Sequence, residues 1–141
     1  MGCGLEDEAL NALAEETGAL VAEAGCVLVN GGLWRVMRAS ARGCRSRRFD
    51  RHAPGSTLGG QRVHRYPIPT GMGEMRNALI IRAASALIAI GGGYGTLSEM
   101  ALALKSGKPV IGIKTWDISA EVMKTESPVE AVRLALKARG F

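Results

Sequence analysis

The residues of this 141-residue chain that could do chemistry are concentrated in one glycine-rich run, IGGGYGTLSE at positions 90–99. An apolar stretch, residues 86–90, leads into the glycines, and a helix is expected directly behind them. Glycines let a backbone approach a ligand closely, and the first turn of a helix offers unpaired N–H groups with a partial positive charge. The run is therefore suited to hold phosphate or another small anion. Glu99, one turn into the helix, adds a carboxylate that would bind a sugar hydroxyl or take part in chemistry; the alternative is a plain strand-to-helix turn with an exposed Glu.

Two familiar phosphate-binding motifs do not fit this run. A dinucleotide-binding fingerprint needs a third glycine where Ser98 stands, and a P-loop needs a lysine that is missing after these glycines. No group of His, Cys and carboxylate residues has metal-ligand spacing in the sequence. We therefore expect no metal site and no resident cofactor.

The glycine run resembles the P-G-G-x-G-T-x-x-E signature of the "possible lysine decarboxylase" group, which contains the "lonely guy" phosphoribohydrolases and the molybdenum-cofactor carrier proteins. The similarity extends upstream over GEMRNA at residues 73–78 and downstream over GKPVIG at residues 107–112. Residues 67–117 match the group densely and residues 5–43 more loosely. Gly91 stands where the enzymes carry proline, which indicates a less characterised branch close to the carriers.

The resemblance implies a site for a nucleoside 5′-monophosphate or a similar ligand. Arg76 would orient the phosphate and ribose. Glu99 would bind the ribose hydroxyls and stabilise the positive charge that builds up as the base departs, so that these two residues are the expected catalytic pair. Asn77 replaces a basic residue of the enzymes. The expected ligand-binding residues are Gly92, Gly93, Tyr94, Gly95, Thr96, Gly31, Gly32, Thr70 and Asn77.

Three functions stay open at this stage. The chain could bind or carry a nucleotide-like small molecule, hydrolyse the N-glycosidic bond of a nucleoside 5′-monophosphate, or be the inactive product of a damaged gene. Gly91 and Asn77 favour binding over hydrolysis. Lysine decarboxylation is not expected, because nothing resembles a pyridoxal-phosphate lysine site. The resemblance also implies a homo-oligomer that packs through the helix around Arg76.

The elements that must position these residues alternate between helices and strands, which predicts an α/β fold with a Rossmann-like, doubly wound parallel sheet in one domain over residues 1–141. Ligands of such sheets bind at the carboxyl ends of the strands. Strands are expected at residues 26–29, 86–90 and 110–113. Helices are expected at residues 6–24, 36–42, 74–84, 97–106 and 128–138.

The start of the chain predicts an incomplete sheet. Gly2-Cys3-Gly4 resembles the last residues of the family's first strand, which lies at the centre of the sheet, and a helix follows at once. Without that strand, residues 26–29 and 86–90 lose the partner between them, at about 1–3 kcal/mol per buried unpaired backbone group. We therefore expect a sheet that lacks its first, central strand.

Residues 44–66 contain six arginines and one aspartate, so this segment accounts for the whole formal net charge of +5. It could be a basic arm for nucleic acid or a solvated loop. We prefer a frameshift, which disrupts the third strand and removes the argument for nucleic-acid binding. With one choice of synonymous codons, the same bases read one position later encode AEAGGLTGMLPGRPWEANAYID, which resembles the family's third strand and its Leu-Pro-Gly turn.

Composition indicates which compartment and which kinds of partner to expect. Hydrophobic residues make up 47% of the chain, enough for one core, and no apolar run approaches the roughly 20 residues of a membrane span. Three cysteines without C-x-x-C spacing favour a reducing, cytoplasmic setting. We expect a small-molecule ligand and neither nucleic acid nor a membrane as partner.

Overall fold

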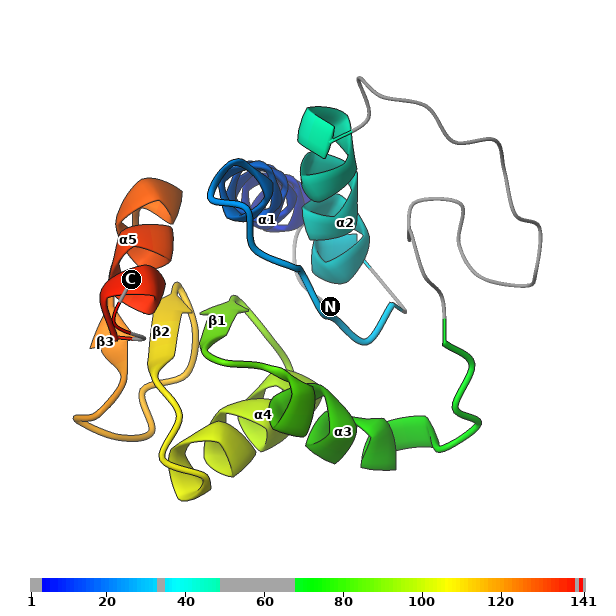
Figure 1. The fold of residues 1–141 in the computed structure, drawn as a ribbon, viewed down its shortest axis with the longest axis vertical. Coiled ribbons are helices and arrows are strands. Elements are labelled where there is room, and N and C mark those ends of the chain that lie inside the picture. The colour runs from blue at the N-terminus through cyan, green and yellow to red at the C-terminus, as the bar shows by residue number, and fades with distance from the viewer. Residues whose placement is uncertain (1–3, 33–34, 49–67, 139, 141) are drawn as a thin grey trace. The chain divides into compact units, whose positions relative to one another are not determined.

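A computed structural model describes residues 4–32, 35–48, 68–138 and 140 (Figure 1). The chain divides into two compact units, Met1–Gly71 and Met72–Phe141, and each is described by itself. The first unit is helical and the second is an α/β unit with a parallel sheet. The expectation of a single domain stays a prediction.

Two helices form the first unit, α1 (Gly4–Glu23) and α2 (Arg35–Arg48). They pack at two glycines, because a β-carbon at Gly18 would lie 1.9 Å from the Ser40 carbonyl oxygen and one at Gly43 would lie 1.7 Å from that of Glu15. Arg42 pairs with Glu15 at 3.1 Å across the same contact. The backbones of the two helices thus touch at positions where only glycine fits.

The prediction of a strand at residues 26–29 is wrong. Residues 26–32 have no regular secondary structure, and Val27 and Val29 are 77% and 45% exposed. An apolar segment becomes a strand only beside a hydrogen-bonding neighbour, and the sheet of the described residues is formed by strands of the second unit. Asn30 orders the turn instead, because its side chain accepts from Gly32 N at 3.0 Å and donates to Met37 O at 2.9 Å.

The second unit contains a three-stranded parallel sheet in the order β1 (Leu87–Ile90), β2 (Val110–Ile113) and β3 (Met123–Lys124). Leu87 pairs with Val110, and Ile111 pairs with Met123. The expected strands at 86–90 and 110–113 are confirmed, whereas β3 was not expected. Within the described sheet β1 is an edge strand, as expected for a sheet without a central strand next to it.

The helices of the second unit supply half of its core cluster. These are α3 (Arg76–Ala83), which follows the short 3-10 turn η1 (Gly73–Met75), α4 (Tyr94–Lys105) between β1 and β2, and α5 (Pro128–Ala138). The core cluster comprises Ile81, Ala89, Met100, Ala103, Val110 and Val122. It ties α3 and α4 to the sheet, while α5 contacts β1 and β2. Residues 110–113 are all buried, as is usual for a strand in a parallel sheet with covered faces.

The helix boundaries differ from expectation at two places. The helix after the glycines begins at Tyr94 and not at residue 97, and the second helix continues to Arg48. Residues 44–48 of the proposed frameshifted segment are therefore helical, while residues 49–66 lie outside the described part of the chain. The frameshift stays a prediction. Within the described ranges, no helix is long and apolar enough to span a bilayer.

Candidate functional site

The glycine loop starts at the end of β1 and is fixed by its backbone. Gly91 N donates to Ile113 O at 2.9 Å, so the loop is tied to the end of the neighbouring strand. Gly91 has φ 57° and Gly92 has φ 125°. Residues with a β-carbon rarely adopt such positive φ values. Two successive positive φ values turn the chain out of the sheet within two residues. The glycines therefore determine the backbone conformation of the loop.

Gly92 is also required by its neighbour Thr96. A β-carbon at Gly92 would lie 2.4 Å from Cβ and 2.5 Å from Oγ1 of Thr96. Thr96 lies in the first turn of α4, so the loop and the helix start are in contact. This contact positions the loop against the helix end.

The N-terminus of α4 is exposed. Gly93 is its N-cap residue and has no side chain to cap the helix, so the first-turn amides of Tyr94, Gly95 and Thr96 lack an acceptor within the helix. Gly93 and Gly95 are exposed, and added β-carbons there would meet open space. Helix-terminal N–H groups in such a setting favour an anion.

Arg76 and Glu99 place opposite charges beside each other on the packed helices α3 and α4. Burial raises the pKa of Glu99 above its usual 4.5, and the positive charge of Arg76 opposes that rise. The Arg76 Nε is buried and has no hydrogen-bond partner among the described residues. A buried donor without an acceptor is uncommon in folded proteins, and it is consistent with a group that receives its acceptor from a ligand.

An aromatic pair flanks the loop. Trp116 Nε1 donates to Gly93 O at 3.2 Å, and the rings of Tyr94 and Trp116 stack with centroids 6.0 Å apart at 27°. Tyr94 is 82% exposed. The sequence predicts Tyr94 at the site but not Trp116, because no local pattern connects Trp116 with Gly93, 23 positions earlier.

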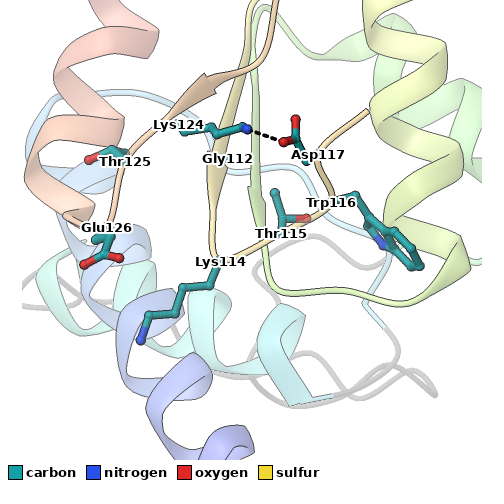
Figure 2. A pocket seen from close by; sticks show the side chains of 8 residues that line it. All are labelled: Gly112, Lys114, Thr115, Trp116, Asp117, Lys124, Thr125 and Glu126. Atoms are coloured by element: carbon teal, nitrogen blue, oxygen red, sulfur yellow. Dashed lines mark ion pairs between the residues drawn. The ribbon is translucent and has the colours of Figure 1, made fainter. Parts of the chain in front are cut away.

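A pocket of about 310 Å³ lies at the carboxyl ends of β2 and β3 (Figure 2). Lys114, which follows β2, has φ 47°, a strained value for a residue with a side chain. Asp117 and Lys124 form an ion pair of 2.7 Å on one side of the pocket, and Trp116 lies at the side toward the glycine loop. The lining residues are Gly112, Lys114, Thr115, Trp116, Asp117, Lys124, Thr125 and Glu126.

The expected site residues divide between the two units. Most of them lie in the second unit, namely Arg76, Asn77, Gly92, Gly93, Tyr94, Gly95, Thr96 and Glu99. Asn77 is 8% exposed in the first turn of α3, next to Arg76. Gly31, Gly32 and the exposed Thr70 belong to the first unit, and their part in the site stays a prediction.

The parallel sheet, the glycine loop and the pocket at the strand ends define an α/β protein of the class whose ligands bind beside the carboxyl ends of the strands. The chain belongs to the SLOG cluster4 family, whose profile matches residues 1–139. The SLOG superfamily includes lysine-decarboxylase-like proteins, so the expected relationship is confirmed at the level of the superfamily. An uncharacterized protein of Archaeoglobus fulgidus is 39% identical over 149 aligned residues, which cover 96% of this chain and 91% of that protein.

Solved structures with the same fold are named for the molybdenum cofactor. The molybdenum cofactor binding protein of Rippkaea orientalis is 29% identical, with a TM-score of 0.79 over 92% of this chain and 87% of the other. The molybdenum cofactor carrier protein of Chlamydomonas reinhardtii is 26% identical, with a TM-score of 0.79 over 93% and 88% of the two chains. The α/β fold expected from the sequence is confirmed.

Proposed function

We propose that this chain binds a phosphate-bearing, nucleotide-like small molecule at the glycine loop. The observation that carries the proposal is the uncapped start of α4, where the chain leaves β1 through Gly91 and Gly92 and exposes the amides of the first turn. In the proposed complex, the residues from Gly92 to Thr96 hold the phosphate by backbone N–H groups and the Thr96 hydroxyl.

Arg76 and Glu99 orient the rest of the ligand in this proposal. The buried Arg76 Nε lacks an acceptor and would donate to a phosphate or ribose oxygen. Glu99, kept partly desolvated, would accept from ribose hydroxyls. Asn77 is a further contact that we propose, whereas the part of Thr70, Gly31 and Gly32 of the first unit stays a prediction.

Carrying rather than turnover is favoured by two points. The solved structures with the same fold are named as binding and carrier proteins for the molybdenum cofactor. Gly91 and Asn77 replace the proline and the basic residue of the related hydrolases. A cofactor of that kind would be held at its anionic part by the loop amides, which fit an anion. The described ranges contain no group of three or more His, Cys, Asp or Glu residues arranged to hold a metal ion.

Calorimetric titration tests the proposal, with AMP, ribose 5-phosphate and adenosine as probes. AMP and ribose 5-phosphate should bind and adenosine should not, because the phosphate is the anchor. Arg76→Gln should weaken AMP binding by about tenfold or more, equivalent to one lost charged hydrogen bond. Arg82→Gln, an exposed arginine at the other end of α3, is the matched control and should leave the affinity unchanged. Equal binding of adenosine and AMP would contradict the phosphate anchor.

A second candidate function is hydrolysis of a nucleoside 5′-monophosphate, in which water adds to the ribose and the base leaves. The raised pKa of Glu99 beside the charge of Arg76 favours it, because perturbed carboxyls are typical of catalytic sites. Incubation with AMP followed by chromatography of free adenine measures this activity. Loss of adenine release in Glu99→Gln with AMP binding retained would support hydrolysis, whereas binding without any turnover would favour the carrier.

We also propose that the protein is a homo-oligomer that packs through the segment around α3. Met75, the N-cap residue of α3, and Leu79 within the helix are 68% and 43% exposed, and they are one helical turn apart in sequence. Sedimentation velocity of the wild type and of Leu79→Glu tests this, because a buried charge at an oligomer contact should shift the population toward monomer. A monomeric wild type would contradict it.

A further inference from the structure

The pocket at the ends of β2 and β3 has one aromatic side chain, that of Trp116, among its lining residues. Lysine, aspartate, glutamate and threonine side chains line most of it, whereas Trp116 supplies a large flat ring at the side toward α4 (Figure 2). With a volume of about 310 Å³, the pocket is at the lower limit of small-molecule sites and is large enough for one ring system.

The position of that ring is fixed from two directions. Its Nε1 donates to Gly93 O, which also accepts the first helical bond of α4 from Leu97 N at 3.1 Å. Tyr94 then stacks on the indole. Although both aromatic side chains are exposed, their geometry is set by the backbone of the phosphate loop. An exposed aromatic pair that is held in one orientation offers a surface on which another flat ring can stack.

We propose that Trp116, supported by Tyr94, is the specificity-determining surface that selects ligands carrying a planar heteroaromatic ring beyond the phosphate. The inference rests on the proposed function, because the loop must hold the phosphate for the ring to reach the pocket. Trp116 connects the two places directly, since it lines the pocket and bonds to the loop at Gly93. The ring would lie against the indole, as bases stack on exposed aromatic side chains in single-stranded nucleic-acid-binding proteins.

The test compares two probes that share a phosphate and differ in the ring, AMP and ribose 5-phosphate. The chain has two tryptophans, so Trp34→Phe leaves Trp116 as the single indole fluorophore. In that background AMP should quench the fluorescence of Trp116, and ribose 5-phosphate should leave it nearly unchanged. By calorimetry AMP should bind about tenfold or more tightly than ribose 5-phosphate.

Removal of the aromatic surface should erase this preference. Trp116→Ala and Tyr94→Ala should each reduce the AMP affinity about tenfold, to that of ribose 5-phosphate, and leave the ribose 5-phosphate affinity unchanged. Ile118→Ala, an exposed apolar residue of the same connection, is the control and should preserve the preference. Tyr94→Ala decides the matter alone if Trp116→Ala does not fold.

The outcomes separate this inference from the proposed function. Binding of both probes with equal affinity, insensitive to Trp116→Ala or Tyr94→Ala, would overturn the aromatic surface and leave the phosphate site standing. Binding of neither probe would overturn both proposals. A preference for AMP that both alanine variants abolish would support both.

Discussion

Gly92 lies directly against the side chain of Thr96, so that a β-carbon at residue 92 would be only 2.4 Å from Thr96 Cβ. Two requirements meet at this glycine, because its φ of 125° is also unsuited to any residue with a side chain. The contact joins the loop that leaves the sheet to the first turn of the helix behind it. It therefore fixes the geometry of the proposed phosphate site.

Gly92→Ala is expected to lose AMP binding and to lower the free energy of unfolding by about 2–4 kcal/mol, from backbone strain and overpacking against Thr96. Gly95→Ala is the matched control for stability, because a methyl group there meets open space in a helical position and should stabilise by up to about 1 kcal/mol. Urea denaturation and calorimetry with AMP measure both effects. A Gly92→Ala variant that binds AMP normally would contradict the loop geometry.

Lys108, two residues before β2, caps the carbonyl end of α3. Its Nζ donates to the backbone oxygens of Ala84 at 2.5 Å, Arg82 at 3.2 Å and Ile81. Lys108→Met should therefore leave these carbonyls without a partner and cost about 1–3 kcal/mol of stability. Lys105→Met, an exposed lysine in the last turn of α4, should change stability by less than about 0.5 kcal/mol. Thermal melting of the two variants checks this, and equal melting temperatures would contradict the capping role.

The sequence predicted those elements of the second unit whose signals are local. The strand at 110–113 is a continuous apolar run, and Ser127-Pro128 marks the start of α5, where Ser127 Oγ accepts from Glu130 N at 3.4 Å. The run at 26–29 looks much the same in composition but is not a strand, because pairing depends on a neighbour that a local pattern cannot reveal. β3 has only two residues, too few for any periodicity.

The residues of the candidate site also differ in whether a local sequence signal reveals them. The glycine loop was visible because positive φ values demand a particular residue type. The pairing of Arg76 with Glu99 came from the family resemblance and not from spacing. Trp116 could not be found, since its role depends on a hydrogen bond to Gly93 that only the folded chain creates.

The two helices of the first unit should be unusually sensitive to methyl groups at their crossing point. Gly18→Ala and Gly43→Ala each push a β-carbon to within 1.9 Å of a backbone oxygen of the partner helix, which has no freedom to rotate away. Each should cost about 3 kcal/mol or more, at the upper end of overpacking. Glu16→Ala, exposed on α1, should have little effect. Urea denaturation followed by circular dichroism measures the loss, and a stable Gly43→Ala variant would contradict the close contact.

The raised pKa of Glu99 should make the free energy of unfolding depend on pH. Burial raises its pKa in the folded protein above the usual 4.5, so between the two values the folded state binds more protons than the unfolded chain. The free energy of unfolding should therefore fall as pH rises from 4.5 through the folded pKa and then stay level. Glu99→Gln removes this loss and should be more stable than the wild type at neutral pH, by a margin that disappears below pH 4.5.

Glu130 supplies the control of opposite sign for that experiment. The hydrogen bond from Arg133 holds the pKa of Glu130 below 4.5, so its contribution to stability is present above pH 4.5 and is lost as pH falls through the folded pKa. Glu130→Gln should thus be slightly less stable than the wild type at neutral pH and equal to it in acid. Urea denaturation of both variants from about pH 2.5 to 8 measures the two slopes. A Glu99→Gln variant that is less stable than the wild type at neutral pH would show that the carboxylate is paired in the folded protein rather than desolvated.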